Sequence, residues 1–305
     1  MKYYLAVDGG GTKTHVLCVD ETGSQIGEGI SGPTNLTVTS VGSASFNLQE
    51  AIRQATPNLP PGEKITKLVM GLAGLDSPAE LQNAHQIFTQ ALQYSPIEQI
   101  TLVNDTLIAL ASGSDAKNAI VLVSGTGSNC YGRNDTGLET KTGGMDFLLT
   151  DDGSAYAIGR ETMRAAVKSF DGRGPKTILE QLVCEHFQVP TIIDLKTVLY
   201  NPLISKMEVA EVARVCTAAF EQKDSVSQSI LDQAAADLFT MITVVTTKLQ
   251  LTDKQSDCVF VGGITRVQYI QDLLRQKISV FAPQMSIQLP PQPPVFGAVK
   301  LALQS

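Results

Sequence analysis

The sequence predicts an α/β protein of two domains that share one strand-and-helix plan. Short apolar and β-branched runs alternate with longer helical patterns, which is the element order of α/β folds. A strand–loop–strand segment near the N-terminus also recurs near the middle of the chain. The 305 residues are enough for two hydrophobic cores, because single cores stop growing at about 250–300 residues.

Several predicted strands are near-continuous apolar runs, typical of central strands buried on both faces. In chain order the predicted strands are residues 3–7, 15–19, 25–29, 67–71, 99–103, 119–123, 129–132 and 258–261. The predicted helices are residues 43–55, 78–93, 154–169, 177–186, 205–222, 225–248, 267–277 and 295–303. Residues 289–294 are proline-rich and too stiff to join a helix, so we expect them to cross between the domains.

The internal repeat is the most informative feature. The first copy reads YLAVDGGGTKTHVLCVDETG over residues 4–23, and the second reads VLVSGTGSNCYGRNDTG over residues 121–137. Each has an apolar strand, a glycine loop with Thr or Ser, a second strand and an acidic turn. A glycine-bearing hairpin differs from the strand–loop–helix of Rossmann and P-loop motifs, and the P-loop pattern GxxxxGK[ST] is absent. The repeat predicts one phosphate-binding loop in each domain.

The first loop offers an anion several donors. Gly10 and Gly11 leave backbone N–H groups bare, while Thr12 and Lys13 add a hydroxyl and an ammonium. Asp8, at the end of its strand, is placed to hold Mg²⁺ directly or through water. The alternative is a tight hairpin turn, but a two-residue turn does not need three glycines in a row.

Two later glycine segments extend this interpretation. Gly125, Thr126 and Gly127 offer uncharged donors suited to β- and γ-phosphates. Gly262 and Gly263 follow a buried strand, where missing side chains would let a base or ribose approach the backbone. A simple turn is the alternative at both places.

Two carboxylates stand at the starts of predicted helices, where capping is the alternative role. Asp105 ends an apolar strand and could accept a proton from a hydroxyl that attacks a γ-phosphate. Asp151 is followed by a second acid, Asp152, which leaves one of the pair to grip substrate hydroxyls. With the glycine loops, these residues predict phosphoryl transfer from ATP.

Composition restricts the partners and the compartment. The formal net charge is −7 and no Lys/Arg-rich run stands out, so we expect neither nucleic acid nor an anionic membrane as a partner. The five cysteines are scattered, without a CxxC or Cys/His cluster, and read as buried thiols of a reducing compartment. The N-terminus lacks the pattern of a signal peptide, so we expect a cytoplasmic protein.

The motifs AVDGGGT (6–12), GPTN (32–35), LVSGTGSNC (122–130) and GGMDFLLTDDGSA (143–155) resemble those of the BadF/BadG-type ATPases, in the sugar-kinase/Hsp70/actin-like superfamily. The similarity is greatest to the N-acetylglucosamine kinase branch. It implies duplicated RNase H-like domains, residues 1–117 plus 291–305 and residues 118–290, as two lobes around a cleft. It also implies a homodimer that uses ATP and Mg²⁺ to phosphorylate the 6-hydroxyl of an amino sugar.

The resemblance also implies roles for matching positions. Asp105 falls on the family's catalytic aspartate, and Thr12 and Thr126 fall on phosphate-contacting threonines. The sugar-contacting positions are Asn35, Ser128, Asn129, Gly144, Met145, Asp146 and Asp151, and Ala219 falls on a nucleotide contact. The family often has GGWGH where this chain has GGMDF, so Met145 replaces an aromatic residue.

Alternatives remain open. Glucosamine or N-acetylmuramic acid is a close variant of the acceptor, since Asn35 could bond ring hydroxyls of any of these sugars. An ATPase that activates a 2-hydroxyacyl-CoA dehydratase would need closely placed thiolates for an iron–sulfur cluster, unlike these dispersed cysteines. A non-catalytic sugar sensor would be expected to lack Asp8 or Asp105, and both are present.

Overall fold

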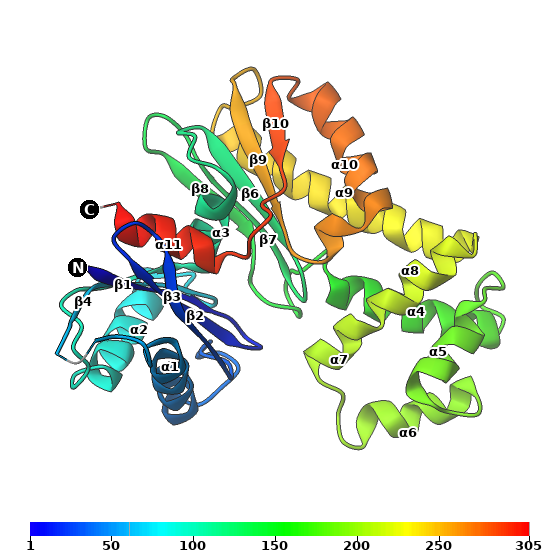
Figure 1. Cartoon of the computed structure of the whole chain (residues 1–305). Coiled ribbons are helices and arrows are strands. Elements are labelled where there is room, and N and C mark those ends of the chain that lie inside the picture. Colours follow the sequence, from blue (N-terminus) through cyan, green and yellow to red (C-terminus); the bar gives the residue numbers. More distant parts are fainter. Residues whose placement is uncertain (61, 305) are drawn as a thin grey trace. The chain divides into compact units, whose positions relative to one another are not determined.

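The computed structural model describes residues 1–60 and 62–304 and divides into two compact units (Figure 1). Unit 1 comprises Met1–Val121 and Gln288–Ser305, and unit 2 comprises Leu122–Ile287. The sequence-based boundaries lie at 117 and 290. Residues 289–294 carry the chain from the last strand of the second sheet into a helix that packs within unit 1.

Unit 1 contains a mixed sheet with strand order β3-β2-β1-β4-β5. Its strands are β1 Tyr3–Gly9, β2 Thr14–Asp20, β3 Gln25–Ser31, β4 Ile65–Leu72 and β5 Ile100–Asn104. β1, β2 and β3 form an antiparallel meander, while β4 pairs in parallel with both β1 and β5. The carboxyl ends of β1, β4 and β5 therefore meet at one edge, the usual place for a ligand in such sheets.

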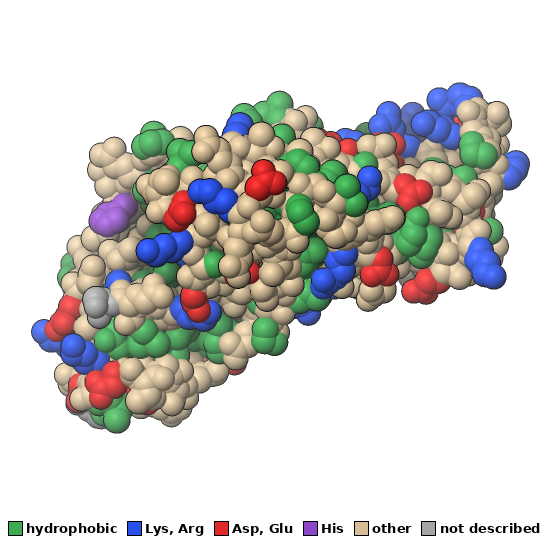
Figure 2. Space-filling model, turned by 90° about the horizontal axis from the view of Figure 1, so that it is seen from above, with side chains coloured by type: hydrophobic (Ala, Val, Ile, Leu, Met, Phe, Trp, Pro, Cys, Tyr) green, Lys and Arg blue, Asp and Glu red, His purple; other side chains and the backbone are tan. Residues whose placement is uncertain are grey.

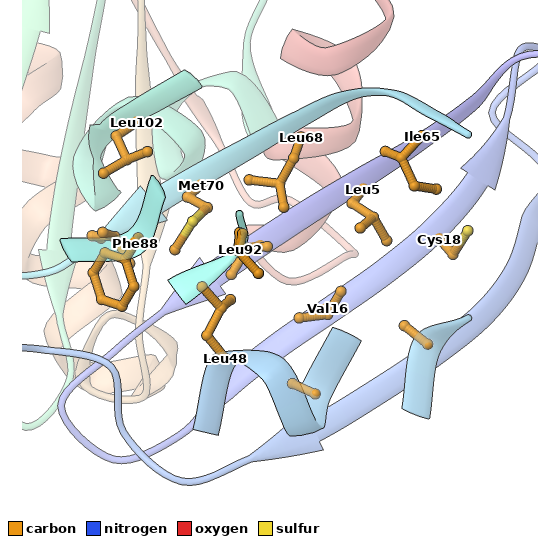
Figure 3. Packing of buried hydrophobic residues seen from close by; sticks show 14 of the residues in the cluster. Leu5, Val16, Cys18, Leu48, Ile65, Leu68, Met70, Phe88, Leu92 and Leu102 are labelled. Carbon is orange, nitrogen blue, oxygen red and sulfur yellow. The ribbon is translucent and has the colours of Figure 1, made fainter. Parts of the chain in front are cut away.

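Alternating side chains of β1 cover both faces of this sheet. Tyr3, Leu5 and Val7 pack in a core with helices α1 (Val41–Ala55) and α2 (Pro78–Ala91), and Figure 3 shows Leu5 among its neighbours. Tyr4 and Ala6 face a second core with α3 (Asp105–Gly113) and α11 (Val295–Leu303). Burial on both faces explains why β1 is a continuous apolar run.

The second sheet, most of which belongs to unit 2, repeats the same plan. Its strands are β6 Ala119–Ser124, β7 Ser128–Arg133, β8 Glu139–Gly143, β9 Ser256–Val261 and β10 Met285–Gln288, in the order β10-β9-β6-β7-β8. Matching β6 with β1 and continuing along the chain gives the strand order of unit 1. The duplication predicted from the repeated hairpin is confirmed. β8 and β10 were not predicted, because they are short and largely polar.

The helices of unit 2 lie mainly between β8 and β9. They are α4 Ala155–Phe170, α5 Leu179–Phe187, α6 Leu195–Tyr200, α7 Lys206–Glu211, α8 Ala213–Glu221 and α9 Ser225–Lys248, and α10 (Gln268–Phe281) follows β9. Short 3₁₀ turns are η1 Ile192–Asp194 and η2 Ile264–Arg266. One continuous helix over 205–222 was wrong: the Val212 amide donates to the Val209 carbonyl, a tighter i→i−3 bond that separates α7 from α8.

By length and mean hydropathy alone, α9 could cross a membrane. Its apolar residues pack against α4, α8 and α10 instead, as those of a core helix do. On the face shown in Figure 2, acidic and basic side chains are interspersed over most of the surface, and Lys and Arg side chains gather at the upper right.

Candidate functional site

The first glycine loop is tied to the segment that carries Asn35. The amide of Gly10 donates to the carbonyl of Lys13 at 2.9 Å, which closes the turn between β1 and β2. The carbonyl of Gly10 accepts from the amides of Thr34 and Asn35 at 3.2 and 3.3 Å. The structure therefore brings the predicted phosphate loop and the predicted sugar-binding asparagine together within unit 1.

The hydrogen bonds of Asn35 fix which end of its amide group is available. Its Oδ1 accepts from the amide and hydroxyl of Thr37, at 2.9 and 2.8 Å. Because a backbone N–H must meet an oxygen, this assigns the orientation of the carboxamide. The bonds to Thr37 thus engage Oδ1 and leave Nδ2 as the other polar end of the carboxamide.

Asp8 and Asp105 form a pair of like charges at the carboxyl edge of the sheet. Burial, and then the charge of Asp105, raise the pKa of Asp8 to about 6, while Lys13 works in the opposite direction. An ionised pair of this kind favours binding of a cation, because a divalent ion offsets both charges.

Asp105 is not the residue that caps α3. The cap is Asn104, whose Oδ1 accepts from the amide and hydroxyl of Thr106 at 3.0 and 2.6 Å. Its Nδ2 also donates to the carbonyl of Leu75 at 2.8 Å, which joins the end of β5 to the loop after β4. Asn104 therefore fills the capping role that was the alternative for Asp105.

The second glycine loop is held against the start of α4. The amide of Gly125 donates to the carbonyl of Gly127 at 3.0 Å, and the carbonyl of Gly125 accepts from Ala155 at 2.9 Å. The carbonyl of Thr126 accepts from Tyr156 at 3.3 Å. These bonds fix the loop's conformation before any ligand is bound.

Asp151 contacts the second glycine loop at Gly127 and Ser128. It is buried, with a left-handed backbone (φ 68°), and its Oδ1 accepts from the amide of Ser128 at 3.0 Å. A Cβ on Gly127 would lie 2.9 Å from both carboxylate oxygens, so any larger residue there would displace the Asp151 carboxylate. Ser154, and not Asp151, caps α4 by accepting from the amide of Ala157. The capping alternative for Asp151 fails.

Lys206 is a site residue that sequence reasoning missed. Its Nζ pairs with Asp151 at 2.8 Å and also contacts the carboxylate of Asp146. Burial acts to lower the pKa of Lys206, but hydrogen bonds to Asp146 and Asp151 outweigh it and raise the pKa. No motif marks this lysine, since it lies on another helix, 60 residues from Asp146.

The other sugar-contacting residues predicted in unit 2 lie on β7 and in the segment that follows β8. Asn129 follows Ser128 on β7, and its Oδ1 is buried without a hydrogen-bond partner in the described part of the chain. Gly144 packs near the side chain of Lys141, whereas Met145 is exposed. An unpartnered buried acceptor is the kind of group that a ligand hydroxyl satisfies.

Gly262 joins the third glycine segment to the second loop. Its φ of +105° is in the region that favours glycine, and a Cβ would lie 2.1 Å from the carbonyl oxygen of Ser124. Gly263 has open space around it. Unit 2 thus brings together the second and third glycine segments.

Replacing Gly262 with alanine is expected to destabilise the protein by about 2–4 kcal/mol, because strain and a backbone clash act together. Chemical denaturation would measure this. Gly263→Ala is the matched control and is expected to change stability by less than about 1 kcal/mol. Equal stability of the two variants would contradict the close approach of Gly262 to Ser124.

Ala219 and Lys13, both predicted nucleotide contacts, lie in different surroundings. Ala219 is fully buried in a core with residues of α4 and α5, and its carbonyl accepts from the amides of Gln222 and Asp224. Its role as a nucleotide contact stays a prediction. Lys13 is exposed and lies near Asp8. Within residues 1–60 and 62–304, no group of three or more His, Cys, Asp or Glu side chains is arranged to hold a metal.

The model of the BadF/BadG/BcrA/BcrD ATPase family matches residues 5–303 of the chain. The N-acetylmuramic acid/N-acetylglucosamine kinase of Clostridium acetobutylicum is 34% identical, covering 99% of this chain and 98% of the relative. The N-acetyl-D-glucosamine kinase of Dictyostelium discoideum is 31% identical, covering the same shares of the two chains.

A solved structure shares the fold. The crystal structure of a candidate N-acetylglucosamine kinase from Chromobacterium violaceum aligns with a TM-score of 0.78 and 20% identity, over 100% of this chain and 99% of that chain. With the repeated strand order, this confirms the predicted fold class, the duplicated RNase H-like plan of actin-like ATPases.

Proposed function

Because this chain belongs to the BadF/BadG/BcrA/BcrD ATPase family, we propose that it is an ATP-dependent kinase of N-acetyl-D-glucosamine, acting on the 6-hydroxyl. The activities of the relatives from Clostridium and Dictyostelium support an amino-sugar kinase. The observation that carries the proposal is the pair of Asp8 and Asp105 beside the first glycine loop, at the carboxyl edge of parallel strands.

Unit 1 would supply the base and part of the acceptor site. Asp105 would orient the 6-hydroxyl and take its proton as the oxygen attacks the γ-phosphorus. The bond between the γ-phosphorus and its bridging oxygen then breaks and ADP leaves. Asn35 would donate from Nδ2 to the oxygen of a ring hydroxyl of the sugar, since its Oδ1 is engaged by Thr37.

The residues present fit a magnesium ion. Asp8 would hold it, directly or through water, and the raised pKa of this carboxyl, caused by burial and the charge of Asp105, supports a cation there. When bound, the ion supplies neutralisation of phosphate charge. Thr12 and the amides of Gly10 and Gly11 are proposed to add donors to the phosphates, with Lys13 beside them.

Unit 2 would supply a second set of donors. Gly125 and Ser128 use their amides inside the loop, so Thr126 and Gly127 are the residues we propose to bind β- and γ-phosphate oxygens. Gly262 and Gly263 would border the nucleoside. Asn129 Oδ1 would accept from a sugar hydroxyl, and Asp151 would accept from another.

A panel of acceptors tests this function. ADP release would be measured with N-acetylglucosamine, glucosamine, N-acetylmuramic acid and glucose at equal concentrations. We expect kcat/KM to be highest for N-acetylglucosamine, and product analysis to place the phosphate on the 6-hydroxyl. A strong preference for glucose would overturn the amino-sugar assignment.

N-acetylmuramic acid is the second candidate acceptor, because the relative from Clostridium acts on both N-acetylated sugars. Similar kcat/KM values for both sugars in the same panel would favour this dual activity. Higher kcat/KM for glucosamine would indicate instead that the acetyl group is not recognised.

A further inference from the structure

The ammonium of Lys206 pairs with two carboxylates, those of Asp146 and Asp151. It is the first residue of α7, and Ser205 caps that helix by accepting from the amide of Glu208 at 3.2 Å. The carboxylate of Glu208 accepts in return from the amide and hydroxyl of Ser205, at 2.9 and 2.6 Å. This reciprocal cap fixes where α7 begins and hence where the Lys206 side chain starts.

Asp151 needs a cation. Its side chain is 4% exposed, it stands under Gly127 of the second glycine loop, and its Oδ1 already holds the amide of Ser128. An unpaired carboxylate in such a place is strongly unfavourable, because burial removes its hydration. Lys206 supplies the positive charge at 2.8 Å from Oδ2.

Asp146 gives Lys206 a second anchor. It belongs to the loop between β8 and α4, its backbone is left-handed (φ 67°), and its Oδ1 accepts from the amide of Phe147 at 2.8 Å. The Nζ of Lys206 lies 5.6 Å from the centre of the Phe147 ring, within the range of a cation–π contact. The ammonium of Lys206 therefore binds the carboxylates at both ends of the segment 146–151.

We propose that Lys206 is a positioning residue for the acceptor sugar: its ion pair holds the Asp151 carboxylate in place, and its contact with Asp146 fastens the loop 144–150 that carries Met145 and Asp146. The inference rests on the proposed kinase function, in which Asp151 and this loop contact the sugar. Lys206 itself acts through these residues.

The test compares Lys206→Met with wild type in steady-state kinetics. We expect KM for N-acetylglucosamine to rise by about tenfold to a hundredfold, because the sugar-contacting groups lose their geometry. KM for ATP is expected to change by less than about threefold, since the second glycine loop is also held by its own bonds to α4. Lys206→Arg should recover much of the loss. A rise in KM for sugar below about twofold, or an equal rise for ATP, would overturn the proposal.

A double-mutant cycle shows whether Lys206 acts through Asp151. In an Asp151→Asn background, Lys206→Met is expected to raise KM for the sugar by a smaller factor than in wild type, because only the contact with Asp146 is then left to lose. The same large effect in both backgrounds would contradict the proposed route. Lys196→Met, at an exposed lysine of α6 outside the ion pairs described, is the control and should match wild type.

A readout without turnover separates this inference from the kinase proposal. Leu148 and Leu149 are highly exposed, so chymotrypsin should cleave the loop near them. Lys206→Met is expected to speed this cleavage by about fivefold or more, and Lys196→Met to leave it unchanged. Unchanged cleavage in Lys206→Met would overturn the anchoring of the loop. Absence of sugar phosphorylation by wild type would overturn the kinase proposal instead.

Discussion

Asp105→Asn is expected to lower kcat by about 10²–10⁴-fold, because the amide cannot take the proton of the attacking hydroxyl. Quench-flow or coupled assay of ADP release would measure the loss. Because Asn104 and not Asp105 caps α3, the substitution removes no cap, and loss of the repulsion between Asp105 and Asp8 should leave the melting temperature equal or higher. Binding of ATP, measured by calorimetry, should remain within about threefold of wild type.

Asn104→Ala is the matched control, since it changes the adjacent residue. It removes the cap of α3 and the bond to the carbonyl of Leu75, so we expect a loss of about 1–3 kcal/mol in stability. Its kcat should fall far less than that of Asp105→Asn. If Asp105→Asn kept more than about a tenth of wild-type turnover, the proposed base would be wrong even with the fold intact.

The repeated hairpin made the architecture predictable. Its two copies became β1–β2 and β6–β7, and burial on both faces of β1 explains the apolar run that marked it. β8 and β10 escaped prediction because a sheet can recruit short polar strands once its centre is formed. The tight turn at Val212 also left no pattern, because the helical periodicity continues through it.

Parts of the candidate site could also be predicted from the sequence, because their residues lie in local motifs. Glycines at strand ends, Asp8 and Asp105 all belong to local motifs whose chemistry is carried by neighbouring residues. The sequence could not show whether Asn104 or Asp105 caps α3, because both residue types are good caps, and the structure shows that Asn104 does. Lys206 could not be predicted from the sequence, because only the tertiary fold brings it to Asp146 and Asp151.

The ionised form of Asp8 costs the folded protein stability, and this gives the second large prediction. Burial and the charge of Asp105 raise its pKa to about 6, so the folded chain holds the proton more tightly than the unfolded chain does. The stability contributed by the protonated carboxyl is complete below about pH 4 and is lost as pH rises through about 6. Above that pH, the ionised carboxylate is a burden on the apo protein.

Asp8→Asn is therefore expected to raise the melting temperature of the metal-free protein at pH 8 by about 2–8 °C. The substitution removes the cost of burying an ionised carboxylate beside Asp105, which is about 1–3 kcal/mol. At pH 4 the two proteins should melt together, because Asp8 is then protonated. Scanning calorimetry at both pH values measures this.

The same variant should lose turnover by about a hundredfold or more, since its neutral amide is a poor ligand for Mg²⁺. Millimolar Mg²⁺ should raise the melting temperature of wild type at pH 8 and leave that of Asp8→Asn unchanged, because a ligand stabilises only the state that binds it. Asp105→Asn separates the two causes of the raised pKa: removing the neighbouring charge should lower the pKa of Asp8 and leave the part due to burial. If Asp8→Asn were less stable at pH 8 and still fully active, Asp8 would be a structural carboxylate and the metal would have to be held elsewhere.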